Sequence, residues 1–182
     1  MVRDARSVLA RGAGCSYGDA ALNAGGMVVA MLGVDCIGAV DAIAQTVSVD
    51  AGVRLGVLSD HLARQGWALP VVPGTRHVTV GGAIAADVHG KNHRSNGSLS
   101  SWVRSMDLVT PLGASTVSPV ADPELFWATT GGMGLTGIVT TAVLSVAPIG
   151  SGWYRSTTRR TADLDDISGR DADLFRRRIC RG

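Results

Sequence analysis

The chain has 182 residues, of which 46% are hydrophobic and 18% are charged, so it can bury one core that belongs to one domain or a little more. Its formal net charge is only +2, and its lysines and arginines are scattered except at the extreme C-terminus. This charge pattern argues against a nucleic-acid-binding protein.

The first half of the chain predicts two short buried strands and one amphipathic helix. Apolar and β-branched residues predict strands over Met27–Met31 and Thr46–Val49. A helix is predicted over Arg54–Gln65, and Gly66 is a natural stop for it. Three leucines share one face of this helix: Leu55, Leu58 and Leu62.

The second half predicts a hairpin, a short helix and one more strand. The hairpin pairs Trp102–Thr110 with Ala114–Ser118 around the turn Pro111-Leu112-Gly113. Asp122 precedes a proline and starts a helix that runs through Thr129. A strand follows over Gly137–Val146.

Three glycine-rich segments interrupt these elements, and we expect them to share one site. They are Arg11-Gly12-Ala13-Gly14-Cys15-Ser16-Tyr17-Gly18-Asp19, the stretch Pro73–His93, and Gly131-Gly132-Met133-Gly134-Leu135-Thr136-Gly137. In the second segment the glycines permit close approach of a ligand to the backbone, and Thr75 and Thr79 supply hydroxyl groups. We also expect the small residues after Thr79 to offer free N–H groups to an anion, which indicates a phosphorylated cofactor.

A nicotinamide-binding Rossmann fold is a weaker interpretation of the first glycine segment. Its glycines are spaced G-x-G-x-x-x-G, little chain precedes it, and no helical pattern follows it.

The cysteines and the hydropathy pattern indicate neither a disulfide-rich nor a membrane-spanning protein. Cys15, Cys36 and Cys180 are odd in number and widely separated, so neither a disulfide framework nor a zinc site is expected, and reduced thiols suit the cytoplasm. The uncharged stretch Ala24–Val34 is too short to cross a bilayer, and the N-terminus lacks the order of a signal peptide.

Five motifs, taken in order, resemble the flavin-binding domain of the vanillyl-alcohol-oxidase-like, FAD-linked oxidases over residues 8–148. Besides the first glycine segment they are Val49-Asp50-Ala51-Gly52-Val53, Pro73-Gly74-Thr75, Thr79-Val80-Gly81-Gly82-Ala83-Ile84-Ala85 and Gly134-Leu135-Thr136-Gly137-Ile138. The resemblance implies an α+β fold of the PCMH type, in which two α+β subdomains hold an extended FAD between them.

The same resemblance implies a domain division and missing segments. We expect an FAD-binding domain over residues 1–150, shortened by the family's first βαβ segment. Residues 151–182 would be the start or a remnant of the substrate domain, with a poorly ordered tail.

Carried over residue by residue, the resemblance implies a set of FAD-binding positions. The loop that would wrap the pyrophosphate and the flavin edge comprises Ala10, Arg11, Gly12, Ala13, Gly14, Cys15, Ser16, Tyr17, Gly18, Asp19 and Ala20. The pyrophosphate and ribityl chain would be lined by Gly74, Thr75, Thr79, Val80, Gly81 and Gly82. Ala86, Asp87, Val88 and His89 would lie beside the isoalloxazine, and Ile138 near the adenine.

The resemblance makes His89 and Lys91 the candidate catalytic residues, both facing the substrate. The alternatives are a simple polar loop over the core, a solvated surface lysine at Lys91, and metal binding by His89 and His93. The metal alternative is weak because Gly90 separates the two histidines and no glutamate follows the first, so no metal is expected.

Covalently flavinylated members carry a histidine at the position of Cys15, so we expect non-covalent FAD here. The stretch Asp87–His93 most resembles members that oxidise the 2'-hydroxyl of a polyprenyl-phosphoryl ribose by hydride transfer to the flavin, which implies a partner reductase. The expected location is the cytoplasm, with association to the membrane through the lipid-linked substrate. The alternatives are a sugar-lactone or alditol oxidase and a non-catalytic FAD-binding remnant.

Overall fold

The computed structural model describes residues 7–153, 156, 158 and 160–166. It divides the chain into two units, one up to Ile149 and one from Gly150 onward. All the sheets and named helices belong to the first unit. The tail expected to be poorly ordered lies mostly outside the described residues.

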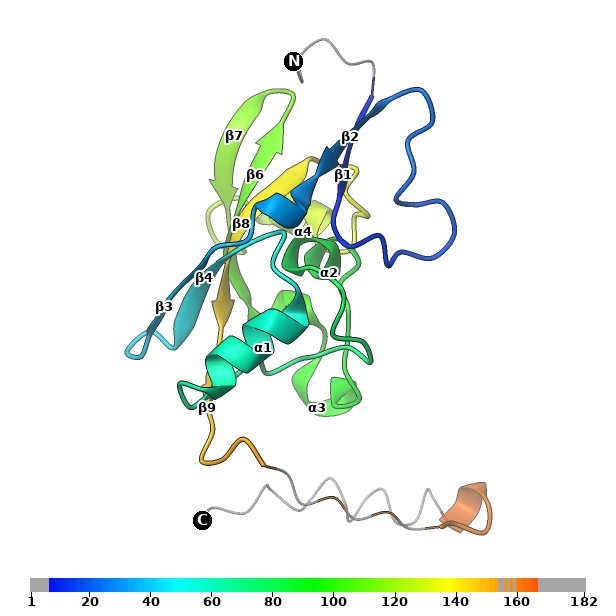
Figure 1. The fold of residues 1–182 in the computed structure, drawn as a ribbon, viewed down its shortest axis with the longest axis vertical. Coiled ribbons are helices and arrows are strands. Elements are labelled where there is room, and N and C mark those ends of the chain that lie inside the picture. Colours follow the sequence, from blue (N-terminus) through cyan, green and yellow to red (C-terminus); the bar gives the residue numbers. More distant parts are fainter. Residues whose placement is uncertain (1–6, 154–155, 157, 159, 167–182) are drawn as a thin grey trace. The chain divides into compact units, whose positions relative to one another are not determined.

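A five-stranded antiparallel sheet is the largest sheet of the described residues (Figure 1). Its strand order is β3-β4-β8-β6-β7. The strands span Ile37–Asp41 (β3), Thr46–Asp50 (β4), Val103–Thr110 (β6), Gly113–Val117 (β7) and Ile138–Ser145 (β8). β8 lies at the centre, where Ala142 pairs with Val49 on one side and with Met106 on the other. All three side chains are buried, so one face of the sheet belongs to the core.

A separate pair of parallel strands carries the first glycine segment. β1 (Val8–Arg11) pairs in register with β2 (Met27–Ala30), and the short 3-10 helix η2 (Met31–Gly33) follows. A third, very short pair joins β5 (Trp67–Ala68) to β9 (Ala147–Pro148). The predicted strand over Met27–Met31 is therefore confirmed as a strand, but Val28 on it is 42% exposed, so the expectation that it is fully buried was wrong.

The helices pack around this core. α1 is Leu55–Ala63, α2 is Val80–Ala85, α3 is His93–Asn96, and α4 is Pro123–Thr129, while the 3-10 helix η3 is Leu99–Trp102. Figure 1 shows α2 between α1 and the β1–β2 pair. No helix in the described part of the chain combines the length and the apolar character needed to cross a bilayer.

The predicted helix, hairpin and strands are confirmed with small shifts at their ends. The three leucines of α1 are fully buried, and Gly66 has a positive φ of 81° just after the helix. The Asp122 side chain accepts a hydrogen bond from Leu125 N–H and so caps α4. The sequence pattern did not indicate β3, α3 or η3, which are short or lack an apolar period.

The sequence assigns Trp67, Trp102, Trp127 and Trp153 to packing at the core and its rim, and the structure agrees only in part. Trp67 packs against the core, and the Trp102 indole donates to the carbonyl of Asn96 at 2.8 Å. Trp153 is 92% exposed, so the prediction was wrong for this residue.

Gly52 lies where η2 approaches the end of β4. A Cβ at this position would overlap the carbonyl oxygen of Met31 and would lie 2.5 Å from that of Val34. Both obstacles are backbone atoms, and Gly52 N–H itself donates to the Val34 carbonyl at 2.9 Å. The turn therefore requires a residue without a side chain.

We expect Gly52→Ala to lower the free energy of unfolding by about 1–3 kcal/mol or more, because the backbone must move to admit the methyl group. Urea unfolding followed by circular dichroism measures this. Gly33→Ala is the matched control, since nothing lies within 4 Å of a Cβ built there. Equal midpoints for the two variants would show that the turn is not tight.

Candidate functional site

A cavity of the first unit has a volume of about 740 Å³. This volume falls in the range of pockets that bind drug-sized ligands and cofactors. The cavity is lined by residues from all three glycine-rich segments, as the prediction of one shared site requires. Most of the predicted binding residues line it: Ala10, Arg11, Gly12, Ala13, Gly14, Cys15, Ser16, Tyr17, Ala20, Gly74, Thr75, Thr79, Gly81, Gly82, Ala86, Asp87, Val88 and His89.

The first glycine segment meets the second at one very close contact. A Cβ on Gly12 would overlap the hydroxyl oxygen of Thr79, and Thr79 is only 2% exposed. Gly14 and Gly18 have φ values of 68° and 60°, which turn the loop where other residues would be strained. Glycine at position 12 thus brings the loop directly onto the N-terminus of α2.

This loop keeps its backbone donors available. Within the described residues, the main-chain N–H groups of residues 13–18 donate none of the hydrogen bonds found between protein groups. Most of the loop is exposed, and Tyr17 is 98% exposed. Free N–H groups on a glycine-rich turn are the donors that bind phosphate oxygens.

The start of α2 does not supply such donors, which corrects the expectation from the sequence. Val80 N–H donates to the Val53 carbonyl and Gly81 N–H to the Ala51 carbonyl, both at 2.8 Å. Gly82 N–H donates to the Thr79 hydroxyl at 3.3 Å. The chain itself satisfies the first turn of the helix, so the prediction of free N–H groups after Thr79 was wrong.

The third glycine segment closes the other end of α2. Gly131 N–H donates to the Ile84 carbonyl at 3.0 Å, and Met133 N–H to the Ala85 carbonyl at 2.8 Å. Met133, Gly134 and Gly137 then line the cavity. This segment was expected to share the site, but none of these three residues was among the predicted FAD-binding positions.

The apolar residues of the cavity wall that sequence reasoning did not assign to the site include Met31, Ala51, Val78 and Val139. Met31, Ala51 and Val139 are less than 9% exposed and look like ordinary core residues in the sequence. No local pattern separates them from the core, because strand pairing alone brings them to one place.

His89 lies in a loop held by several hydrogen bonds. It bridges to Ser98, and its ring contacts the His93 ring edge to face, with centroids 5.1 Å apart. The Asn92 amide donates to the Pro70 carbonyl at 2.8 Å, and Asp87, with a φ of 40°, accepts from Ser100 N–H at 3.0 Å. The loop thus has a defined shape beside the cavity.

Five predicted residues do not line the cavity. Lys91 is exposed beside the His89 loop, and Gly18 and Asp19 form a turn in which the Asp19 carbonyl accepts from Leu22 N–H. Val80 is fully buried in the core, and Ile138 packs against that core. In the described residues, no group of three or more histidine, cysteine, aspartate or glutamate side chains has the arrangement of a metal site.

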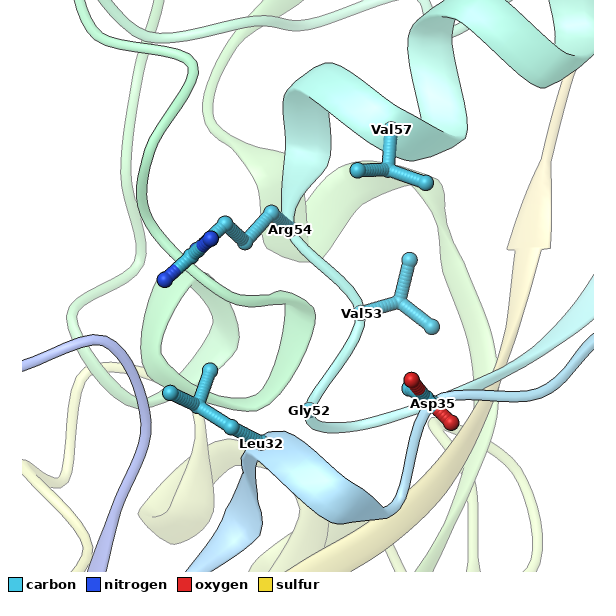
Figure 2. A pocket seen from close by; sticks show the side chains of 6 residues that line it. All are labelled: Leu32, Asp35, Gly52, Val53, Arg54 and Val57. Carbon is cyan, nitrogen blue, oxygen red and sulfur yellow. The ribbon is translucent and has the colours of Figure 1, made fainter.

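A second, smaller hollow of about 180 Å³ is lined by Leu32, Asp35, Gly52, Val53, Arg54 and Val57 (Figure 2). In Figure 2 the side chains of Arg54 and Asp35 extend to opposite sides of it. Its volume is below the usual range for small-molecule sites. None of the predicted site residues lies here, so the larger cavity is the candidate site.

The larger cavity fits an extended dinucleotide with a phosphate-containing middle. It combines a loop of free N–H groups, apolar walls, and glycines such as Gly74, where a Cβ would find nothing within 4 Å. The fold and the cavity therefore define a dinucleotide-binding domain without a Rossmann fold.

Comparison with known proteins identifies the dinucleotide. The model of the family described as "FAD binding domain" matches residues 1–117, which is more than half of the chain. The chain belongs to this FAD-binding family, of the PCMH type, and FAD is its cofactor.

Two relatives and one solved structure show what the chain resembles. Decaprenylphosphoryl-beta-D-ribose oxidase of Mycolicibacterium smegmatis is 46% identical over 163 residues, which cover 88% of this chain and 35% of that protein. Alditol oxidase of a Streptomyces species is 31% identical over 141 residues, 75% of this chain and 34% of that protein. The chain thus spans about a third of the length of these relatives.

The solved structure of an alkyldihydroxyacetonephosphate synthase superposes with a TM-score of 0.69 at 23% identity, over 78% of this chain and 27% of that one. At this identity the likeness shows the fold alone.

Gly74 offers a direct test of the cavity. We expect Gly74→Val to weaken FAD binding by about tenfold or more, because the new side chain meets no protein atom and occupies ligand space instead. Quenching of flavin fluorescence measures the dissociation constant. Gly33→Val is the control with equal free space outside the cavity. If a folded Gly74→Val variant bound FAD with wild-type affinity, the cofactor would not lie against this wall.

The thiol of Cys15 is the group to which FAD could be attached covalently in the first glycine segment. Its thiol is free, exposed and lines the cavity. We predict non-covalent binding, so acid precipitation should leave the yellow colour in the supernatant. A yellow pellet from the wild-type chain, but not from Cys15→Ser, would instead establish a thioether bond at this residue.

Proposed function

We propose that this chain is the FAD-binding part of an oxidoreductase that oxidises a sugar hydroxyl, with the 2'-hydroxyl of a polyprenyl-phosphoryl ribose as the substrate group. The observation that carries the proposal is the 46% identity to the mycobacterial ribose oxidase over 88% of the chain. A match over 88% of the chain includes the His89 loop.

When bound, FAD would supply the acceptor for a hydride from the carbinol carbon of the sugar, while the hydroxyl proton would pass to a base or to water. The residues of this chain would bind the cofactor and orient the substrate. The free N–H groups of residues 13–18 would hold the pyrophosphate, and the apolar wall would exclude water from the cofactor. His89 lies on the cavity wall and orients the reacting hydroxyl, because its loop holds the imidazole against the His93 ring.

Lys91 has a different part in the proposal. Its side chain is exposed and lies outside the cavity wall, two residues beyond His89. There its positive charge can interact with an anionic group of the substrate, such as a phosphoryl oxygen, or with negative charge that develops on the sugar oxygen.

The product of such a reaction is a keto sugar, which a separate reductase would have to consume. The exposed, free thiols of Cys15 and Cys36 suit the reducing cytoplasm, where we place the reaction. The chain spans about a third of the length of the ribose oxidase.

The second candidate is oxidation of a soluble polyol or sugar lactone. The 31% identity to alditol oxidase supports it, because the same type of domain there belongs to an enzyme of a soluble substrate.

A chimera tests which substrate class is right. Residues 8–148 of this chain would replace the matching segment of the mycobacterial oxidase, and the substrate would be mixed with the FAD-loaded chimera without oxygen. We expect polyprenyl-phosphoryl ribose to bleach the flavin absorbance, while alditols and lactones leave it unchanged. Bleaching by an alditol alone would favour the second candidate instead.

In the same chimera, we expect His89→Ala to slow flavin reduction by about tenfold to a hundredfold, because a misplaced hydroxyl reacts less often. FAD content should not change. His61→Gln is the control, since this histidine lies on α1 outside the cavity wall. If His89→Ala reduced the flavin at the wild-type rate, His89 would have no part in orienting the substrate.

A further inference from the structure

The segment that follows Pro73 has two faces with different surroundings. Pro73, Gly74 and Thr75 line the large cavity, and so do Val78 and Thr79. Arg76 and His77, in the middle of the segment, are absent from the cavity wall and are exposed. The side chain of Arg76 extends toward α1 instead.

Arg76 makes two side-chain contacts with α1 through one nitrogen atom. Its Nη2 donates to the Gly56 carbonyl at 3.0 Å and to the Asp60 carboxylate at 2.5 Å. Gly56 and Asp60 are four residues apart, one helical turn, so the guanidinium covers the first turn of α1. The pair with Asp60 is an ion pair whose side chains are 57% and 60% exposed.

The backbone next to Arg76 is joined to the same turn. Gly56 N–H donates to the Arg76 carbonyl and Leu55 N–H to the Val78 carbonyl, both at 2.9 Å. These two carbonyls satisfy N–H groups at the start of α1 that have no partner inside the helix. These hydrogen bonds therefore join the N-terminus of α1 to the segment that follows Pro73.

Gly56 makes this close approach possible. A Cβ at position 56 would lie 2.5 Å from Nε, 3.0 Å from Cβ and 3.0 Å from the carbonyl oxygen of Arg76. The first turn of α1 is thus shaped to receive Arg76.

Few other bonds hold the cavity face of the segment. For residues 73–77, the only hydrogen bond found in the described structure apart from those of Arg76 is His77 N–H to the Thr75 hydroxyl, at 3.3 Å. Gly74 has nothing within 4 Å of a Cβ position. The position of residues 73–75 in this wall therefore depends mainly on the bonds that Arg76 makes to α1 through its side chain and its carbonyl.

We propose that Arg76 is a positioning residue for FAD, which fixes the Pro73–Thr79 wall before the cofactor binds by holding it to Gly56 and Asp60 of α1. The proposal rests on the FAD site described above. Exposed ion pairs contribute little to fold stability, whereas a wall ordered in advance spares the cofactor the entropy cost of ordering it. Arg76 should therefore affect FAD affinity more than stability.

The test uses the 182-residue chain with four variants: Arg76→Gln, Asp60→Asn, their combination, and Arg76→Lys. Flavin fluorescence quenching measures the FAD dissociation constant, and circular dichroism measures the melting temperature. We expect each single neutral variant to bind FAD up to about fivefold more weakly, the most that an exposed pair usually contributes. The double variant should be no weaker than the weaker single, because the two residues act as one pair.

Arg76→Lys should recover most of the affinity, since an ammonium group can still reach the carbonyl or the carboxylate. His77→Gln is the matched control, because this neighbour is exposed and lies outside the cavity wall. The melting temperatures of all these variants should stay close to that of the wild-type chain.

Three results would overturn the inference. They are wild-type FAD affinity in both single variants, additive losses in the double variant, and a loss of affinity that follows a fall in melting temperature. If Arg76→Gln does not fold, Asp60→Asn alone decides, because it leaves the guanidinium and its bond to Gly56 in place. A wild-type chain that binds no FAD would overturn the cofactor site and this inference together.

Discussion

The contact between Gly12 and Thr79 is the constraint on which the site depends. Thr79 is almost fully buried, caps α2 with its hydroxyl group, and lies so close to Gly12 that a methyl group at position 12 would overlap it. This contact joins the parallel β1–β2 pair to the helix that packs on the five-stranded sheet. A larger residue at position 12 would separate the two walls of the FAD cavity.

The backbone of the site divides its hydrogen-bonding groups between folding and binding. The carbonyls of Ala51 and Val53 satisfy the start of α2, and those of Arg76 and Val78 satisfy the start of α1. These bonds hold the starts of α1 and α2 in place, and the N–H groups that make them are not available to a ligand. Donors remain on the loop of residues 13–18, where positive φ values at Gly14 and Gly18 keep the chain outside any helix or strand. We therefore propose this loop as the anion-binding part of the site.

Much of the fold was predictable because the local signals agree with the tertiary structure. Leu55, Leu58 and Leu62 predicted the buried face of α1, and Asp122 with Pro123 predicted the start of α4. β3 was missed because its exposed and half-buried residues have no clear alternation, and its pairing with β4 contains a bulge.

The chemical groups of the site can be identified from the sequence alone: three glycine-rich segments, hydroxyl groups at Thr75 and Thr79, and a polar stretch around His89. Which of these groups face the cavity depends on the tertiary structure. In the folded chain Val80 is buried in the core, and the N–H groups at the start of α2 donate to the carbonyls of a distant segment. Met31 and Val139 lie in the cavity wall. The physical reason is that hydrogen-bond partners and strand register are set between residues far apart in the chain, where no local pattern records them.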